Sequence, residues 1–176
     1  MENRYALSSR IFHWLMALII LGLLGIGIYM TNFLSKESLN RDLFYSLHKS
    51  FGVIAIFLII LRIGNRIAKK APKLPNTMLK YEIVLSHLGH FGLYLLMIIV
   101  PISGYLMSNS YGYAVKLFSF EMPFLVGTDY GLGKLFSTIH EYGAYLLIAL
   151  IVIHIAAVIK HRFFDKPEND VLQRML

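Results

Sequence analysis

The sequence predicts an all-α integral membrane protein, a four-helix bundle with both termini in the cytoplasm. Three observations lead to this fold class: four long apolar runs, a low content of charged residues, and an uneven distribution of Lys and Arg between the connections. Charged residues make up 15% of the 176 residues and apolar residues 57%, whereas an average soluble domain has about 25% charged residues. We expect a single transmembrane domain that covers residues 1–176.

Each of the four apolar runs is long enough to cross a bilayer, which takes about 20 residues of helix. The predicted spans are Ile11–Met30, Leu47–Ile67, Leu85–Met107 and Leu135–Ile159. The first is preceded by basic residues, as in a signal peptide, but no A-x-A-like cleavage site follows it, so we expect a retained span. The connection 108–134 is rich in Gly and aromatic residues, which predicts a loop with at most one short interfacial helix.

The basic residues indicate the orientation. The amino terminus, the second connection and the carboxyl-terminal tail share one side of the membrane and hold 12 of the 17 Lys and Arg residues. Because cytoplasmic segments carry the excess of Lys and Arg, this side is expected to be the cytoplasm. Membrane topology thus explains the net charge of +7. The lipid bilayer is an expected partner, and a nucleic acid is not.

Six of the seven histidines lie in or just inside the spans: His13, His48, His87, His90, His140 and His154. His48 and His140 both open their spans from the outer side, so they are at the same depth and can pair. His154 follows His140 by fourteen residues, a rise of about 21 Å on nearly the same helix face, and can meet His13, His87 or His90 near the cytoplasm. We expect His161, at the cytoplasmic exit, to be solvated.

Two imidazoles that face each other across a bundle can bind both axial positions of a haem iron, or hold a metal such as zinc. A structural zinc site usually has four ligands, often thiolates, and the chain has no cysteine. A histidine that only packs and forms a hydrogen bond is the simpler alternative. Haem fits best, since a porphyrin needs two imidazoles and a gap lined by small residues. Such residues follow four of the histidines at i+3 or i+4: Ala17 after His13, Gly52 after His48, Gly143 after His140 and Ala157 after His154.

Small neighbours therefore favour His13 over His87 and His90 as the partner of His154. Haem propionates need cations near each membrane surface. The candidates are Arg10, Arg62, Lys160 and Arg162 inside, and Arg41, Lys49 and Lys134 outside. Lys49 is the strongest of these, because it adjoins His48.

The chain resembles the bacterial cytochrome b561 family in four segments that occur in the family's order. These are "IFHWLMA", "HKSFGVIAIFLIILRIGNR", "HLGHFGLYLLMIIVPISGYLMS" and "IHEYGAYLLIALIVIHIAAVIKH". The resemblance implies two non-covalent b haems, with iron bound by His48 and His140 on the outer side and by His13 and His154 on the inner side. His90 belongs to the family pattern without being a ligand.

The resemblance also implies an oxidoreductase of the bacterial inner membrane. Its electrons would pass between a one-electron donor, such as superoxide or a periplasmic redox partner, and a quinone such as ubiquinone. A second interpretation is the membrane cytochrome b subunit of a larger dehydrogenase or hydrogenase. A third is a carrier or structural protein without haem.

Overall fold

Four long helices form the protein: α1 (Leu7–Asn32), α2 (Arg41–Ala68), α3 (Lys80–Ser110) and α4 (Tyr130–Phe163). The computed structural model describes residues 4–176. Each helix contains one predicted span and extends beyond it at both ends. With 26 to 34 residues, each is longer than the hydrocarbon core of a bilayer, which is about 30 Å thick. All four are long and apolar enough to cross a membrane, so the predicted all-α membrane fold is confirmed.

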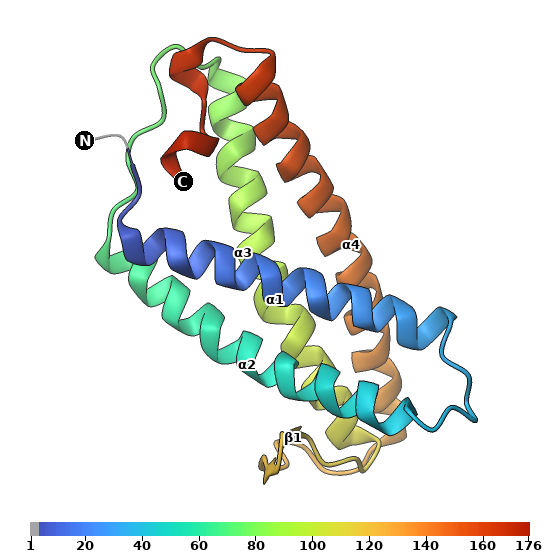
Figure 1. Cartoon of the computed structure of the whole chain (residues 1–176). Coiled ribbons are helices and arrows are strands. Elements are labelled where there is room, and N and C mark those ends of the chain that lie inside the picture. Colours follow the sequence, from blue (N-terminus) through green and yellow to red (C-terminus); the bar gives the residue numbers. More distant parts are fainter. Residues whose placement is uncertain (1–3) are drawn as a thin grey trace.

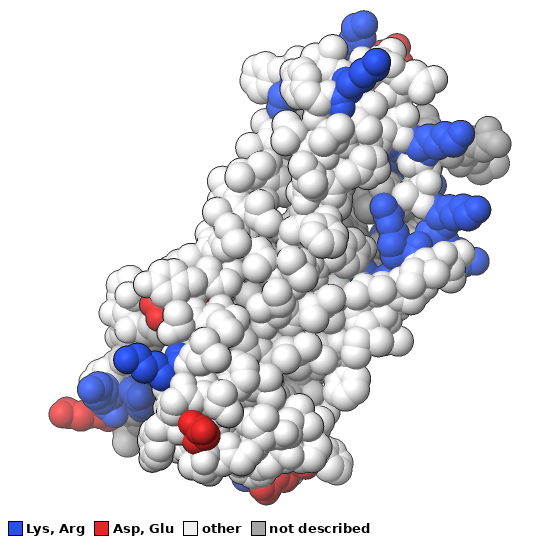
Figure 2. All heavy atoms as spheres, turned by 180° about the vertical axis from the view of Figure 1, so that it is seen from behind, with Lys and Arg blue, Asp and Glu red and all other residues white. Residues whose placement is uncertain are grey.

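The helices pack as two pairs, α1 beside α2 and α3 beside α4, and α2 joins the pairs through α3 (Figure 1). All four helices contribute to one core, made of Met16, Ile20, Ala55, Leu58, Ile59, Leu96, Met97, Val100 and Leu147. Figure 2 shows charged side chains at the two ends of the molecule, with a broad uncharged band between them. Such a band is the expected surface of a protein that contacts lipid.

One end of the bundle, here called the termini end, holds both chain termini and the connection between α2 and α3 (Figure 1). After α4 the chain forms two 3₁₀ turns, η1 (Pro167–Asn169) and η2 (Leu172–Arg174). This tail folds back on the start of the chain. The Tyr5 N–H donates to the Arg174 carbonyl and the Trp14 indole to the Met175 carbonyl, each at 3.0 Å. Both termini therefore lie at one end of the bundle, and its cytoplasmic orientation stays a prediction.

The opposite end, here called the hairpin end, carries a small antiparallel hairpin of β1 (Lys116–Leu117) and β2 (Phe120–Glu121). The connection is a loop, as expected, and it contains this hairpin in place of a short interfacial helix. The backbone groups of the segment pair with each other and with the buried hydroxyl of Ser50, which donates to the Lys116 carbonyl and accepts from the Phe118 N–H. Phe118 has φ of 54°, a conformation that costs free energy for a bulky residue, and Ser50 stabilises it.

Candidate functional site

Two histidines face each other at the hairpin end. The rings of His48 on α2 and His140 on α4 have centroids 6.1 Å apart and planes at 88°. His140 Nδ1 lies 2.8 Å from the Val100 carbonyl oxygen. Because a carbonyl only accepts hydrogen bonds, Nδ1 carries the proton and Nε2 keeps a free lone pair. His140 is thus held in the tautomer that binds a metal through Nε2.

Gly104 makes room for the His140 ring, whereas Gly27 faces the His48 ring at an ordinary contact distance. A Cβ atom at Gly104 would lie 2.8 Å from both Nδ1 and Cε1 of His140, and one at Gly27 would lie 3.5 Å from Cε1 of His48. Any side chain at Gly104 would therefore displace His140 or the α3 backbone. The absence of a side chain at Gly104 lets the His140 imidazole pack against the α3 backbone.

Three histidines form a cluster at the termini end. The ring of His154 on α4 lies 6.3 Å from that of His13 on α1 and 5.6 Å from that of His90 on α3. His90 donates from Nδ1 to the Ser86 carbonyl at 2.7 Å, so its Nε2 is also free. His13 differs, because its Nδ1 lies 3.0 Å from the Arg62 guanidinium, which only donates.

Both predicted pairs have the spacing that an iron with two axial imidazoles requires. With metal–nitrogen bonds of about 2 Å, and about 1 Å from each nitrogen to its ring centre, the two centroids are about 6 Å apart. The observed distances are 6.1 and 6.3 Å. In addition, His48 Nδ1 and Arg10 Nε are buried and have no partner in hydrogen-bond geometry. The residues present therefore fit a haem at each end, with Arg10 available for a propionate.

The structure also places three other residues considered in the sequence analysis: Lys49, His87 and His161. Lys49 is partly buried with its amine 5.4 Å from the centre of the Tyr113 ring. His87 is exposed, away from the cluster formed by its neighbour His90. The expectation of a solvated His161 is wrong, because the residue is only 8% exposed. Asp165, one turn further along, accepts a 2.7 Å hydrogen bond from its Nδ1.

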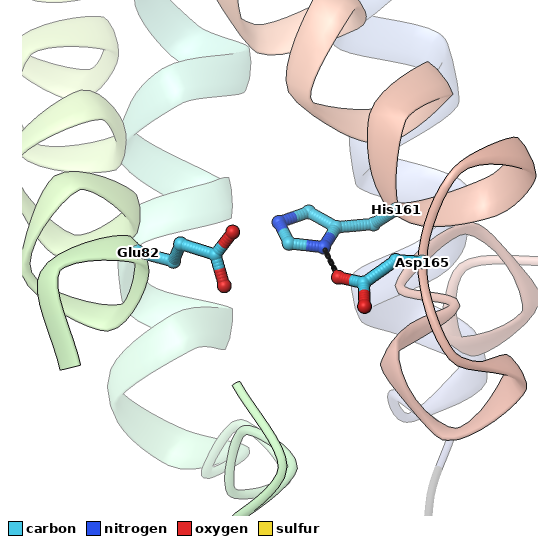
Figure 3. A group of neighbouring side chains, drawn as sticks. All are labelled: Glu82, His161 and Asp165. Carbon is cyan, nitrogen blue, oxygen red and sulfur yellow. Dashed lines mark hydrogen bonds and ion pairs between the residues drawn. The ribbon is translucent and has the colours of Figure 1, made fainter. Parts of the chain in front are cut away.

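His161, Asp165 and Glu82 lie close together at the termini end (Figure 3), with one ligand atom from each within 4.8 Å of the others. This set could hold a metal ion. Lys160, however, binds both carboxylates, from Glu82 and from Asp165. Hydrogen bonds from the Lys166 N–H, Asn169 and His161 also keep the pKa of Asp165 well below its usual range. We interpret the group as an ion-paired link between α3 and α4.

Gly27 and Gly104 were not predicted from the sequence. The small residues predicted to line the haem gaps lie on the same helix as each histidine, at i+3 or i+4. The glycines that contact His48 and His140 lie instead on the facing helices α1 and α3. The signal was present in "PISGYLM", but the rotation of α3 relative to α4 is needed to interpret it.

Comparison with known proteins identifies the family of this chain. The family model described as "Prokaryotic cytochrome b561" matches residues 4–176. The chain is 29% identical over 175 residues to "Cytochrome b561 homolog 2" of Escherichia coli (strain K12), covering 99% of this chain and 92% of that protein. It is 24% identical over 175 residues to "Probable superoxide oxidase CybB" of Yersinia pestis, covering 99% and 97%. The chain belongs to the prokaryotic cytochrome b561 family.

Proposed function

We propose that this chain carries electrons across the bacterial inner membrane on two non-covalent b haems within the single domain 1–176. As a member of its family it is a multi-pass membrane protein that transfers electrons by b-type haem. A b haem with two histidine ligands supplies one-electron chemistry and has no open axial position for oxygen. The proposal adds the number of haems, their ligands and their exchange partners.

The observation that carries the proposal is the pair of close imidazoles at each end of one bundle. The first pair is His48 and His140, and the second is His13 and His154. Helix α4 provides one histidine to each pair, and the fourteen residues between them rise by about 21 Å. Two sites at this separation would connect the two halves of a membrane.

The surrounding residues would orient the ligands and bind the haem carboxylates. The Val100 carbonyl fixes His140 with a free Nε2. Arg10, with a buried Nε that has no partner, would bind a propionate at the termini end. Lys49, beside His48, would do so at the hairpin end. Each of these interactions places a cation against a carboxylate.

A donor site is proposed at the hairpin end, which the excess of Lys and Arg at the termini end would place outside the cytoplasm. A cavity of about 200 Å³ opens there, lined by Asp42, Tyr45, Ser46, Lys49, Ala114 and Lys116. Two lysines against one aspartate favour a small anion. Superoxide is the anion we propose, by analogy with the name of the Yersinia relative. A quinone would exchange electrons within the membrane, making the chain an oxidoreductase.

The first test is haem content of the detergent-purified chain, measured by the pyridine haemochromogen assay. We expect about two b haems per chain, and about one in His140→Ala and in His154→Ala. His87→Ala is the matched control, because this exposed histidine should leave both haems in place. A well-folded protein without haem, or equal spectra for the two ligand variants, would contradict the proposal.

A second test addresses the donor and acceptor. Superoxide should reduce the haem, and a short-chain ubiquinone added afterwards should reoxidise it. Both reactions are followed by the haem absorbance bands. Lys116→Gln should slow the first reaction several-fold at low salt, since a positive cavity attracts an anion. The control Lys36→Gln changes an exposed lysine on the α1–α2 connection. Equal rates in both variants would exclude the cavity as the entry site.

A further inference from the structure

Arg62 lies inside the bundle at the termini end, and each of its three guanidinium nitrogens contacts a hydrogen-bond acceptor. Its Nη2 contacts His13 Nδ1 at 3.0 Å, its Nη1 donates to the Phe12 carbonyl at 3.2 Å, and its Nε donates to the Tyr94 hydroxyl at 3.2 Å. The guanidinium carbon also lies 5.4 Å from the centre of the Tyr94 ring. A permanent positive charge is therefore held beside the histidine cluster by α1 and α3.

Two of these contacts do not depend on the state of His13. A histidine that binds a metal through Nε2 carries its remaining proton on Nδ1, where it can no longer accept a bond from Arg62. The contact with Nδ1 thus belongs to the protein without haem. The Phe12 carbonyl and the Tyr94 hydroxyl accept from Arg62 in either case. The charge is therefore retained next to His13 when the ligand is bound.

The histidines of the hairpin end have different hydrogen-bond partners. His140 donates to the neutral Val100 carbonyl, an interaction that makes a ligating imidazole more basic. Within residues 4–176, neither His48 nor His140 forms a hydrogen bond with Lys or Arg. The nearby Lys49 points its amine at the Tyr113 ring. A more basic ligand that receives no hydrogen bond from a cation favours the oxidised iron.

We propose that Arg62 is a positioning residue that raises the reduction potential of the haem at His13 and His154 above that of the haem at His48 and His140. The inference rests on the proposed function, because it requires a haem at each end. A cation stabilises the reduced centre, which has one positive charge fewer than the oxidised one. In the interior of a bundle this interaction is screened much less than in water. The termini end then holds an electron more strongly than the hairpin end.

The test is a spectroscopic redox titration of the purified haem-loaded protein and its Arg62 variants. Arg62→Gln should lower the midpoint potential of the termini-end haem. At a fixed potential the ferrous-to-ferric ratio should fall at least tenfold, which corresponds to about 59 mV for a one-electron couple. The midpoint of the hairpin-end haem should stay constant. Arg62→Lys should keep most of the difference, and Tyr94→Phe should lower the same midpoint by less than Arg62→Gln.

Lys69→Gln is the control, since it removes an exposed cation just after the end of α2. It should move neither midpoint. The two haems are assigned with His140→Ala, which retains the termini-end haem, and His154→Ala, which retains the hairpin-end haem. The inference requires the midpoint of the first variant to be higher, and this comparison holds even if Arg62→Gln loses its haem.

The outcomes separate the two proposals. A protein that binds one haem or none contradicts the proposed function. Two other results would overturn only the role of Arg62. The first is two haems with the reverse order of midpoint potentials. The second is an Arg62→Gln variant in which neither midpoint moves, or in which both move equally.

Discussion

The two ends of the bundle hold imidazoles by different chemistry. The termini end has a cluster of three histidine rings (His13, His90 and His154), an internal arginine, and a set of ion pairs that include Lys160 with Glu82 and Arg162 with Asp170. The hairpin end has a pair of rings, of which His140 is positioned by a carbonyl and by Gly104. Its connection is fixed by neutral hydrogen bonds, such as those of Ser50 and the one from Tyr105 to the Pro123 carbonyl.

This difference indicates how each end should respond to change. Charged contacts weaken with salt and with protonation, whereas buried neutral bonds are lost mainly when a partner is removed. At the termini end His90 can also replace His13 as the partner of His154, whereas no third imidazole adjoins the hairpin-end pair within residues 4–176. We therefore expect the hairpin end to fail after single substitutions that the termini end tolerates.

The largest expected effect is on haem content. His48→Ala should abolish the hairpin-end haem, because no third imidazole adjoins that pair within residues 4–176. His13→Ala should keep part of the termini-end haem, since the His90 ring lies 5.6 Å from His154 and has a free Nε2. The pyridine haemochromogen assay measures both. The double variant His13→Ala/His90→Ala should lose this haem. Equal haem loss in His48→Ala and His13→Ala would contradict the predicted difference between the two ends.

A smaller effect is expected from Gly104→Ala. The added Cβ would lie 2.8 Å from the His140 ring, and overpacking of this kind costs about 1–3 kcal/mol. Reduced-minus-oxidised spectra should show selective loss or broadening of the hairpin-end band, together with a lower thermal midpoint. Gly64→Ala on α2 is the control, because its Cβ would have nothing within 4 Å. An unchanged spectrum of Gly104→Ala would show that His140 is not fixed against α3.

The hairpin should loosen in Ser50→Ala. This hydroxyl is fully buried and bonds both Lys116 and Phe118, so its removal leaves backbone groups unsatisfied, at a cost of about 1–3 kcal/mol. Hydrogen exchange of residues 116–121 should become faster while exchange at the termini end is unchanged. Ser46→Ala, an exposed change on the same helix, serves as the control. If exchange in Ser50→Ala stays slow, the hairpin is stabilised by its apolar contacts and not by the Ser50 hydroxyl.

The smallest effect concerns pH at the termini end. Bonds from the Lys166 N–H, Asn169 and His161 lower the pKa of Asp165 from its ordinary 3.8. Its contribution to stability is therefore present above pH 3.8 and is lost as the pH falls toward the folded-state pKa. Asp165→Asn should lower the thermal midpoint at neutral pH, and this difference should shrink below pH 3.8.

The control for this prediction is Glu168→Gln, an exposed change in the same tail. A difference between wild type and Asp165→Asn that stays constant from neutral to acidic pH would show that the carboxylate charge plays no part.

Much of the fold follows from the sequence, because length and apolarity alone identify a helix that crosses a membrane. Depth along each span was also enough to group His48 with His140, and His154 with the histidines of the termini end. The helix rotations could not be derived in this way. They decide that Gly104 contacts His140 and that Arg62 reaches His13. The buried position of His161 depends on a tail that folds back, which hydropathy does not encode.

Helix α4 provides a histidine to both ends, and this has a consequence for biosynthesis. His154 lies on the last of the four helices along the described chain, and His13 lies on the first. Neither pair can form until the fourth helix has entered the membrane beside the others. A chain that is stopped before residue 140 should therefore bind no haem, and cofactor loading would report that insertion is complete.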